Sequence, residues 1–119
     1  MNVYVNASAL SAFGNGMQAT AHNIANVNTR DFEPQTYAYT TGPAEESVLF
    51  LPKAGFDQPM DPPSYPDPTL GYWTDIINNS VDIPREMVNM ITNQRAYEAN
   101  ARTIAAMEDT SGVVLDMVV

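Results

Sequence analysis

The chain contains no cysteine, and its 119 residues include only five Lys and Arg against 14 Asp and Glu. The absence of cysteine excludes a disulfide framework, a thiolate metal site and a cysteine nucleophile. The formal net charge of -9 argues against nucleic acid or an anionic membrane surface as a partner, because like charges repel. No window approaches about 18 apolar residues, so we expect no direct membrane insertion. The amino terminus lacks the pattern of a cleavable signal peptide.

Groups that carry chemistry are also scarce. His22 is the only histidine, and a lone imidazole without a paired carboxylate, serine or second ligand favours a structural role over catalysis or metal binding. The acidic residues between Glu45 and Asp75 are widely separated and flanked by proline. A glycosidase-like carboxylate pair there has no second supporting feature, and we interpret these residues as solvated loop charge. We therefore expect no catalytic residue, no cofactor and no metal site.

The segment from 82 to 119 has the clearest pattern in the chain. Asp82, Pro84 and Glu86 suit a helix start, because they offer a cap, a residue without an N–H and a negative charge near the positive helix end. Apolar or small side chains then recur in steps of three and four, as in a coiled coil. This carboxy-terminal seam consists of Met87, Met90, Tyr97, Ala101, Ile104, Leu115 and Val118. The predicted helix is roughly 55 Å long, too long for this chain to cover.

The first 29 residues carry no formally charged side chain, which is unusual for a solvated helix. The same spacing recurs there in an amino-terminal seam of Val3, Ala7, Leu10, Gly14, Met17, Ala21 and Ile24. Gly14 and Gly16 each weaken a helix by about 1 kcal/mol relative to alanine. We therefore expect this helix to pair with the carboxy-terminal seam and to become ordered when neighbours surround it. An ordinary two-helix hairpin is the alternative.

Asparagines mark the end of the first helix. Asn26 or Asn28 is the predicted cap, because asparagine tolerates the left-handed conformation found at helix ends. Thr29 and Asp31 follow, and their side chains can bond nearby backbone groups and turn the chain.

The middle of the chain has a different composition, with eight of the nine prolines between Pro34 and Pro68. We predict two short strands at residues 37–40 and 47–51, joined by a turn at 41–43. We also predict an extended proline-rich strap at residues 61–68. We predict a mainly α fold, with two long terminal helices packed antiparallel or as a coiled coil. The predicted units are 1–32, the connecting segment 33–79, and 80–119, with the two ends forming one coiled-coil unit.

Two motifs at opposite ends of the chain resemble one known family. Residues 21–29, Ala-His-Asn-Ile-Ala-Asn-Val-Asn-Thr, followed by Phe32, resemble the amino-terminal signature of bacterial flagellar rod and hook axial proteins. Residues 86–91, Glu-Met-Val-Asn-Met-Ile, and 95–100, Arg-Ala-Tyr-Glu-Ala-Asn, resemble the carboxy-terminal signature. The segment from 61 to 72 is similar to the strap of proximal-rod members. One departure is Asp31, where the family usually has glycine.

The resemblance implies a structural subunit of the flagellar basal-body rod that transmits torque from motor to hook. Its partners would be copies of itself, other rod subunits and the flagellar export apparatus, which passes the chain without a cleavable signal. The resemblance assigns to the end of the first helix Asn23, Ile24, Ala25, Asn26, Thr29 and Phe32. It assigns to packing between subunits Met87, Met90, Ile91, Arg95, Tyr97, Glu98 and Asn100. From the seams we add Leu10, Met17, Ile104 and Leu115.

The sequence is also compatible with two other classes of function. A soluble helix-hairpin adaptor or export chaperone would use the same seams to hold a partner helix in a groove. A wall-degrading hydrolase would need convergent carboxylates, and the acidic residues of the middle segment are scattered.

Overall fold

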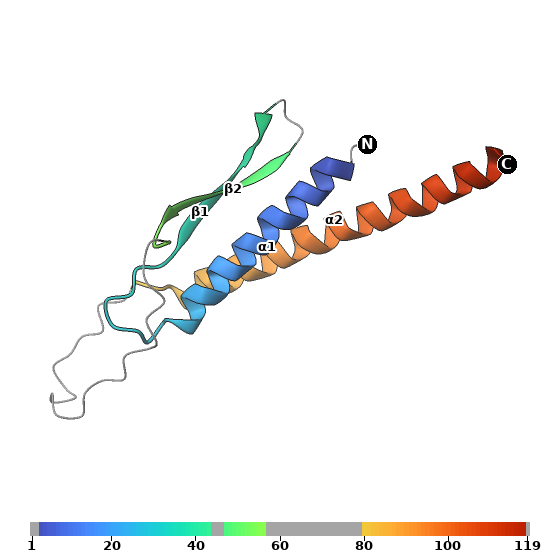
Figure 1. Cartoon of the computed structure of the whole chain (residues 1–119). Helices are drawn as coiled ribbons and strands as arrows, with labels where there is room; N and C mark the ends of the chain where they lie inside the picture. The colour runs from blue at the N-terminus through green and yellow to red at the C-terminus, as the bar shows by residue number, and fades with distance from the viewer. Residues whose placement is uncertain (1–2, 44–46, 57–79, 119) are drawn as a thin grey trace, which may run out of the picture.

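A computed structural model describes residues 3–43, 47–56 and 80–118 of the chain. In order, the elements are α1 (Val3–Ala25), β1 (Thr36–Thr41), β2 (Val48–Ala54) and α2 (Ile83–Val118). The two helices run antiparallel, so that both termini lie at the same end, and the hairpin lies beside α1 (Figure 1). The predicted mainly helical fold is confirmed. The predicted strap at 61–68 lies outside the described residues.

The start of α2 is capped as its sequence predicted. The backbone N–H of Arg85 donates to Oδ1 of Asp82 at 3.2 Å, and the N–H of Glu86 donates to the carbonyl of Asp82 at 2.9 Å. The bond from Arg85 satisfies one of the N–H groups that a helix leaves open at its amino terminus, and the bond from Glu86 is the first regular hydrogen bond of the helix. Pro84 sits in this first turn, where a missing N–H costs little.

The two helices differ in length, and this shapes the molecule. α1 has 23 residues and is roughly 34 Å long, whereas α2 has 36 and is roughly 54 Å long. Near the start of α1, Nδ2 of Asn6 lies 3.6 Å from Sδ of Met107 on α2. Beyond that contact α2 projects past the first turn of α1 (Figure 1). Every residue from 108 to 118 is exposed.

The helices pair, but α1 does so through a different face from the one predicted. The buried residues of α1 are Ala9, Ala12, Gly16, Ala19, Thr20 and Asn23, and none of them belongs to the amino-terminal seam. Small side chains let α2 and the hairpin approach α1 closely at the same time. The bulkier seam residues Leu10 and Met17 are only half-buried. On α2, Met90 and Ile104 are half-buried, whereas Met87 is 54% exposed.

The hairpin, predicted as two short strands, is confirmed. Tyr39 pairs with Phe50 and Tyr37 with Pro52 in an antiparallel register. Because side chains alternate along a strand, the two tyrosines share a face. Their ring centroids are 5.5 Å apart, and Tyr39 meets the ring of Phe13 on α1 at 4.9 Å. An aromatic layer therefore joins the hairpin to α1.

One polar network connects α1, β1 and α2. Asn93 of α2, which is 3% exposed, donates from Nδ2 to the hydroxyl of Tyr37 at 2.8 Å and accepts at Oδ1 from the hydroxyl of Tyr39 at 2.7 Å. The Tyr37 hydroxyl also lies 3.1 Å from Oγ1 of Thr20 on α1. Burial, followed by the neighbouring Tyr37, raises the pKa of the Tyr39 hydroxyl. The side-chain amide of Asn93 therefore joins the three elements.

The two glycines of α1 should respond in opposite ways to alanine. At Gly16 a Cβ would collide with the Tyr39 hydroxyl and lie 2.9 Å from Nδ2 of Asn93, whereas at Gly14 it would meet nothing within 4 Å. Gly16→Ala should therefore destabilise the chain by about 1–3 kcal/mol by disturbing the network. The matched variant Gly14→Ala should stabilise it by about 0.5–1 kcal/mol through helix propensity. Denaturant unfolding followed by circular dichroism measures both; equal effects would contradict the packing at Gly16.

Stability should also fall in alkaline solution because of Tyr39. The folded state raises the pKa of this hydroxyl above its unfolded value. Its contribution is therefore complete below about pH 10 and is lost as pH rises beyond it, when the unfolded chain ionises more readily. Unfolding free energies measured from pH 8 to 11 should decline less steeply in Tyr39→Phe. Tyr97→Phe, on a side chain 39% exposed, retains Tyr39 and should keep the steeper decline.

Candidate assembly surface

The turn that follows α1 is fixed by hydrogen bonds from the side chain of Asn23. Asn23 is fully buried; its Nδ2 donates to the carbonyl of Gln35 at 2.9 Å, and its Oδ1 accepts from the N–H of Gln35 at 2.7 Å. The side-chain amide thus satisfies both backbone groups of one residue, much as a neighbouring strand would. This pair fixes where the chain enters β1.

Asn26 closes the helix through its side chain. Its Nδ2 donates to the carbonyl of His22 at 2.9 Å, and its Oδ1 accepts from Oγ1 of Thr29 at 3.0 Å. The left-handed conformation predicted for Asn26 or Asn28 lies instead at Asp31, the one non-glycine with positive φ (53°) in the described ranges. Asp31 stands where the resembled family usually has glycine, which adopts this conformation without steric cost.

Phe32 anchors the end of the turn. It is 7% exposed, and its ring centroid lies 5.4 Å from that of His22. His22 therefore has a packing role, as expected for a lone histidine. Of the other predicted residues here, Ile24 is half-buried and Ala25 is exposed.

The predicted residues of α2 fall on two sides of the helix. One side carries an outer stripe, which we define as Met87, Val88, Ile91 and Arg95, all exposed. The three apolar members are between 54% and 62% exposed. Their spacing places them on neighbouring turns of one helix surface. The outer stripe is therefore an apolar surface that no described segment covers.

The remaining predicted residues of α2 are partly covered. Met90, Asn100 and Ile104 are half-buried, and Nδ2 of Asn100 donates to the carbonyl of Ala96 at 2.8 Å. Tyr97 is 39% exposed. Glu98 accepts a hydrogen bond from Gln94 at 3.1 Å. The predicted set is thus not a single patch, and Asn93, which the seam pattern omitted, is its most buried neighbour.

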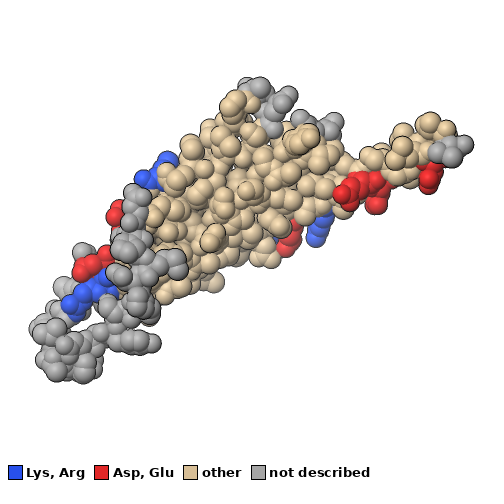
Figure 2. Space-filling model, viewed as in Figure 1, with Lys and Arg blue, Asp and Glu red and all other residues tan. Residues whose placement is uncertain are grey.

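The projecting end of α2 carries a run of exposed apolar side chains. This overhang consists of Val113, Val114, Leu115, Met117 and Val118, which are between 54% and 81% exposed. A shallow groove of about 860 Å³ leads to it from the α1 end; its lining is Arg102, Thr103, Ala106, Met107, Thr110, Ser111, Val114 and Leu115. Figure 2 shows acidic side chains gathered along one edge of the projecting arm, leaving the rest uncharged.

The described residues were also compared with the requirements of a metal site and of a membrane-spanning helix. Within residues 3–43, 47–56 and 80–118, no three His, Asp or Glu side chains are grouped closely enough to hold a metal ion. The helices of the described chain do not combine the length and hydropathy that crossing a bilayer requires.

The sequence of α2 matches a known protein family. Residues 79–117 match the family described as flagellar basal body rod FlgEFG protein C-terminal. The match covers 39 of the 119 residues and includes both carboxy-terminal motifs; the amino-terminal motif lies outside it. No curated protein matched the chain. The comparison therefore shows that residues 79–117, which include nearly all of α2, are similar to the carboxy-terminal region of flagellar basal-body rod proteins.

Proposed function

We propose that this chain is an axial subunit that assembles with copies of itself and other rod subunits, and that the assembled rod transmits torque from motor to hook. The observation that carries the proposal is the exposed apolar surface of α2. The outer stripe and the overhang both expose large apolar side chains outside the contact with α1. Contiguous surfaces of this kind on a soluble chain mark sites of protein contact.

Burial of the exposed side chains contributes free energy on the scale that assembly requires. Each valine, leucine or methionine that becomes fully buried contributes roughly 1.5–3 kcal/mol. Association costs about 4–15 kcal/mol in lost translational and rotational freedom. The five apolar residues of the overhang therefore contribute an amount comparable with that cost when a neighbour covers them.

The two surfaces lie far apart on the same helix. Met87 and Leu115 are separated by roughly 42 Å along α2. Contact between the overhang of one subunit and a different surface of the next is heterologous, and such contacts build open helical filaments rather than closed rings. Close-packed helices deform little, which suits a rod that carries torque.

The site of action follows from the same proposal. The subunit would lie in the part of the rod that spans the periplasm, after passage through the flagellar export apparatus without cleavage of a signal peptide. The absence of cysteine from the sequence is compatible with export of the chain in an unfolded form.

A charge in the overhang should abolish assembly and leave the fold intact. Leu115 is 67% exposed, so Leu115→Asp should keep the helix content of the free chain and prevent its incorporation into basal bodies. Met90 and Ile104 are less suitable sites, because they are half-buried and charge there would also disturb the helix pair. Incorporation is measured by co-purification with basal bodies and by swimming of complemented cells.

The matched control adds the same charge to the same arm. A Cβ added at Gly112 would meet nothing within 4 Å, and this position lies on the helix face shared with Asp109 and Asp116, so Gly112→Asp should assemble normally. Sedimentation of the purified chain separates the rival function. A monomer at all concentrations, with normal rods built from Leu115→Asp, would favour the soluble adaptor and contradict the rod proposal.

A further inference from the structure

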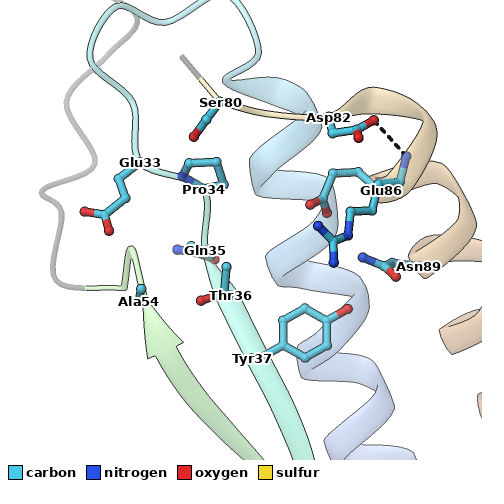
Figure 3. A pocket seen from close by; sticks show the side chains of 11 residues that line it. Glu33, Pro34, Gln35, Thr36, Tyr37, Ala54, Ser80, Asp82, Glu86 and Asn89 are labelled. Atoms are coloured by element: carbon cyan, nitrogen blue, oxygen red, sulfur yellow. Dashed lines mark hydrogen bonds between the residues drawn. The ribbon is translucent and has the colours of Figure 1, made fainter. Parts of the chain in front are cut away.

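A hollow of about 500 Å³ lies at the end of the molecule away from the termini. Here the turn after α1, the end of β2 and the first turns of α2 come together (Figure 3). The side chains that bear on its chemistry are Glu33, Tyr37, Asp82, Arg85, Glu86 and Asn89. The hollow is separate from the outer stripe and from the overhang.

Glu86 is the unusual residue of this hollow. It is 9% exposed, and within the described part of the chain its Oε2 is buried without a hydrogen-bond partner. An unsatisfied buried carboxylate oxygen costs free energy, and native structures leave few of them. Such a group is retained when a ligand satisfies it, because local costs of this kind concentrate at functional sites.

The lining defines what that ligand must be. Glu33 and Asp82 add two carboxylates at exposed positions, and Asn89 adds a half-buried amide. Three carboxylates against one guanidinium, that of Arg85, leave the hollow acidic. A guanidinium matches this lining, because its planar fork of N–H donors pairs with carboxylates in bidentate fashion. Tyr37 also lines the hollow.

The overall charge indicates where the cation comes from. The chain has a net charge of -9 and five basic residues, one of which already lines the hollow. The like net charge of two copies disfavours one copy as the source of a cation for the other, so a more basic chain is the better donor of the guanidinium. We propose that the hollow binds an arginine side chain of a different, more basic protein subunit in the rod, with Glu86 as the carboxylate that receives it. The proposal rests on the proposed function only in naming the partner as a rod subunit.

Glu86 would then reduce the stability of the free subunit and favour its docking. Glu86→Gln removes the buried charge and keeps the shape of the side chain. We expect it to raise the thermal midpoint of the free chain by about 4 °C, because the unpaired charge is gone. A purely structural Glu86 predicts the opposite sign. The matched control is Glu98→Gln, on a half-buried glutamate of the same helix that already accepts a bond from Gln94; it should not raise the midpoint.

Direct binding is tested with N-acetyl-arginine methylamide, titrated into the ¹⁵N-labelled full chain and followed by amide chemical shifts. We expect saturable shifts at Gln35, Tyr37 and Glu86, with about tenfold weaker binding to Glu86→Gln, as for the loss of one charge-assisted hydrogen bond. Arg85→Ala should bind the probe more tightly, because the competing guanidinium is gone. N-acetyl-glutamine methylamide, which is neutral, should give no saturable shift.

Two results would overturn the inference. Shifts that are absent from the hollow, or equal in the wild type and Glu86→Gln, would exclude an arginine site. A loss of self-association in Glu86→Gln, measured by sedimentation of the chain alone, would make a second copy the donor and refute the different subunit. Neither result depends on the overhang, so failure of this inference and failure of the rod proposal are distinguishable.

Discussion

The structure depends on the close approach of three elements at Gly16. The absence of a side chain at this position lets the Tyr39 hydroxyl and the amide of Asn93 meet against the surface of α1. If a larger residue occupied it, the hairpin and α2 would be unable to share α1. Asn93 then satisfies both tyrosine hydroxyls at once, so a buried polar group costs little because all its partners are present.

This arrangement leaves the apolar residues in an uncommon distribution. The buried hydrophobic residues of the described chain are Ala9, Ala12, Ala19 and Phe32, three of them alanines. Larger apolar side chains lie instead on the outer stripe and the overhang. A core so small supports a single subunit only marginally, and the remaining apolar area is suited to neighbours. The similarity of residues 79–117 to the carboxy-terminal region of flagellar basal-body rod proteins is consistent with this distribution, because the proposed rod subunit would be surrounded by other subunits.

Two energetically unfavourable features lie at the end of the molecule away from the termini. Asp31 adopts a left-handed conformation that favours glycine, and Glu86 is buried with one oxygen unpaired. Both lie near the point where α1 ends and α2 begins, and Asn23 holds the intervening turn to the start of β1. Hydrogen bonds fix the backbone of this region, and one buried carboxylate oxygen in it has no partner. Both features suit the docking proposed for the hollow.

Residue patterns alone determined the two helices, the hairpin and the capped start of α2. These features depend on residues a few positions apart, so local propensity and spacing are sufficient to predict them. The motifs of α2, which also consist of neighbouring residues, predicted the family whose model matches residues 79–117. The faces through which the helices pair were not predictable in this way, because they depend on contacts between distant residues. Asn93 and Tyr39 are 54 positions apart, and Asn93 gains its role only when the hairpin brings two hydroxyls to it. Spacing marks which side chains are apolar, but only the tertiary structure decided that small residues and one asparagine turn inward, since close packing of three elements on α1 leaves no room for larger ones.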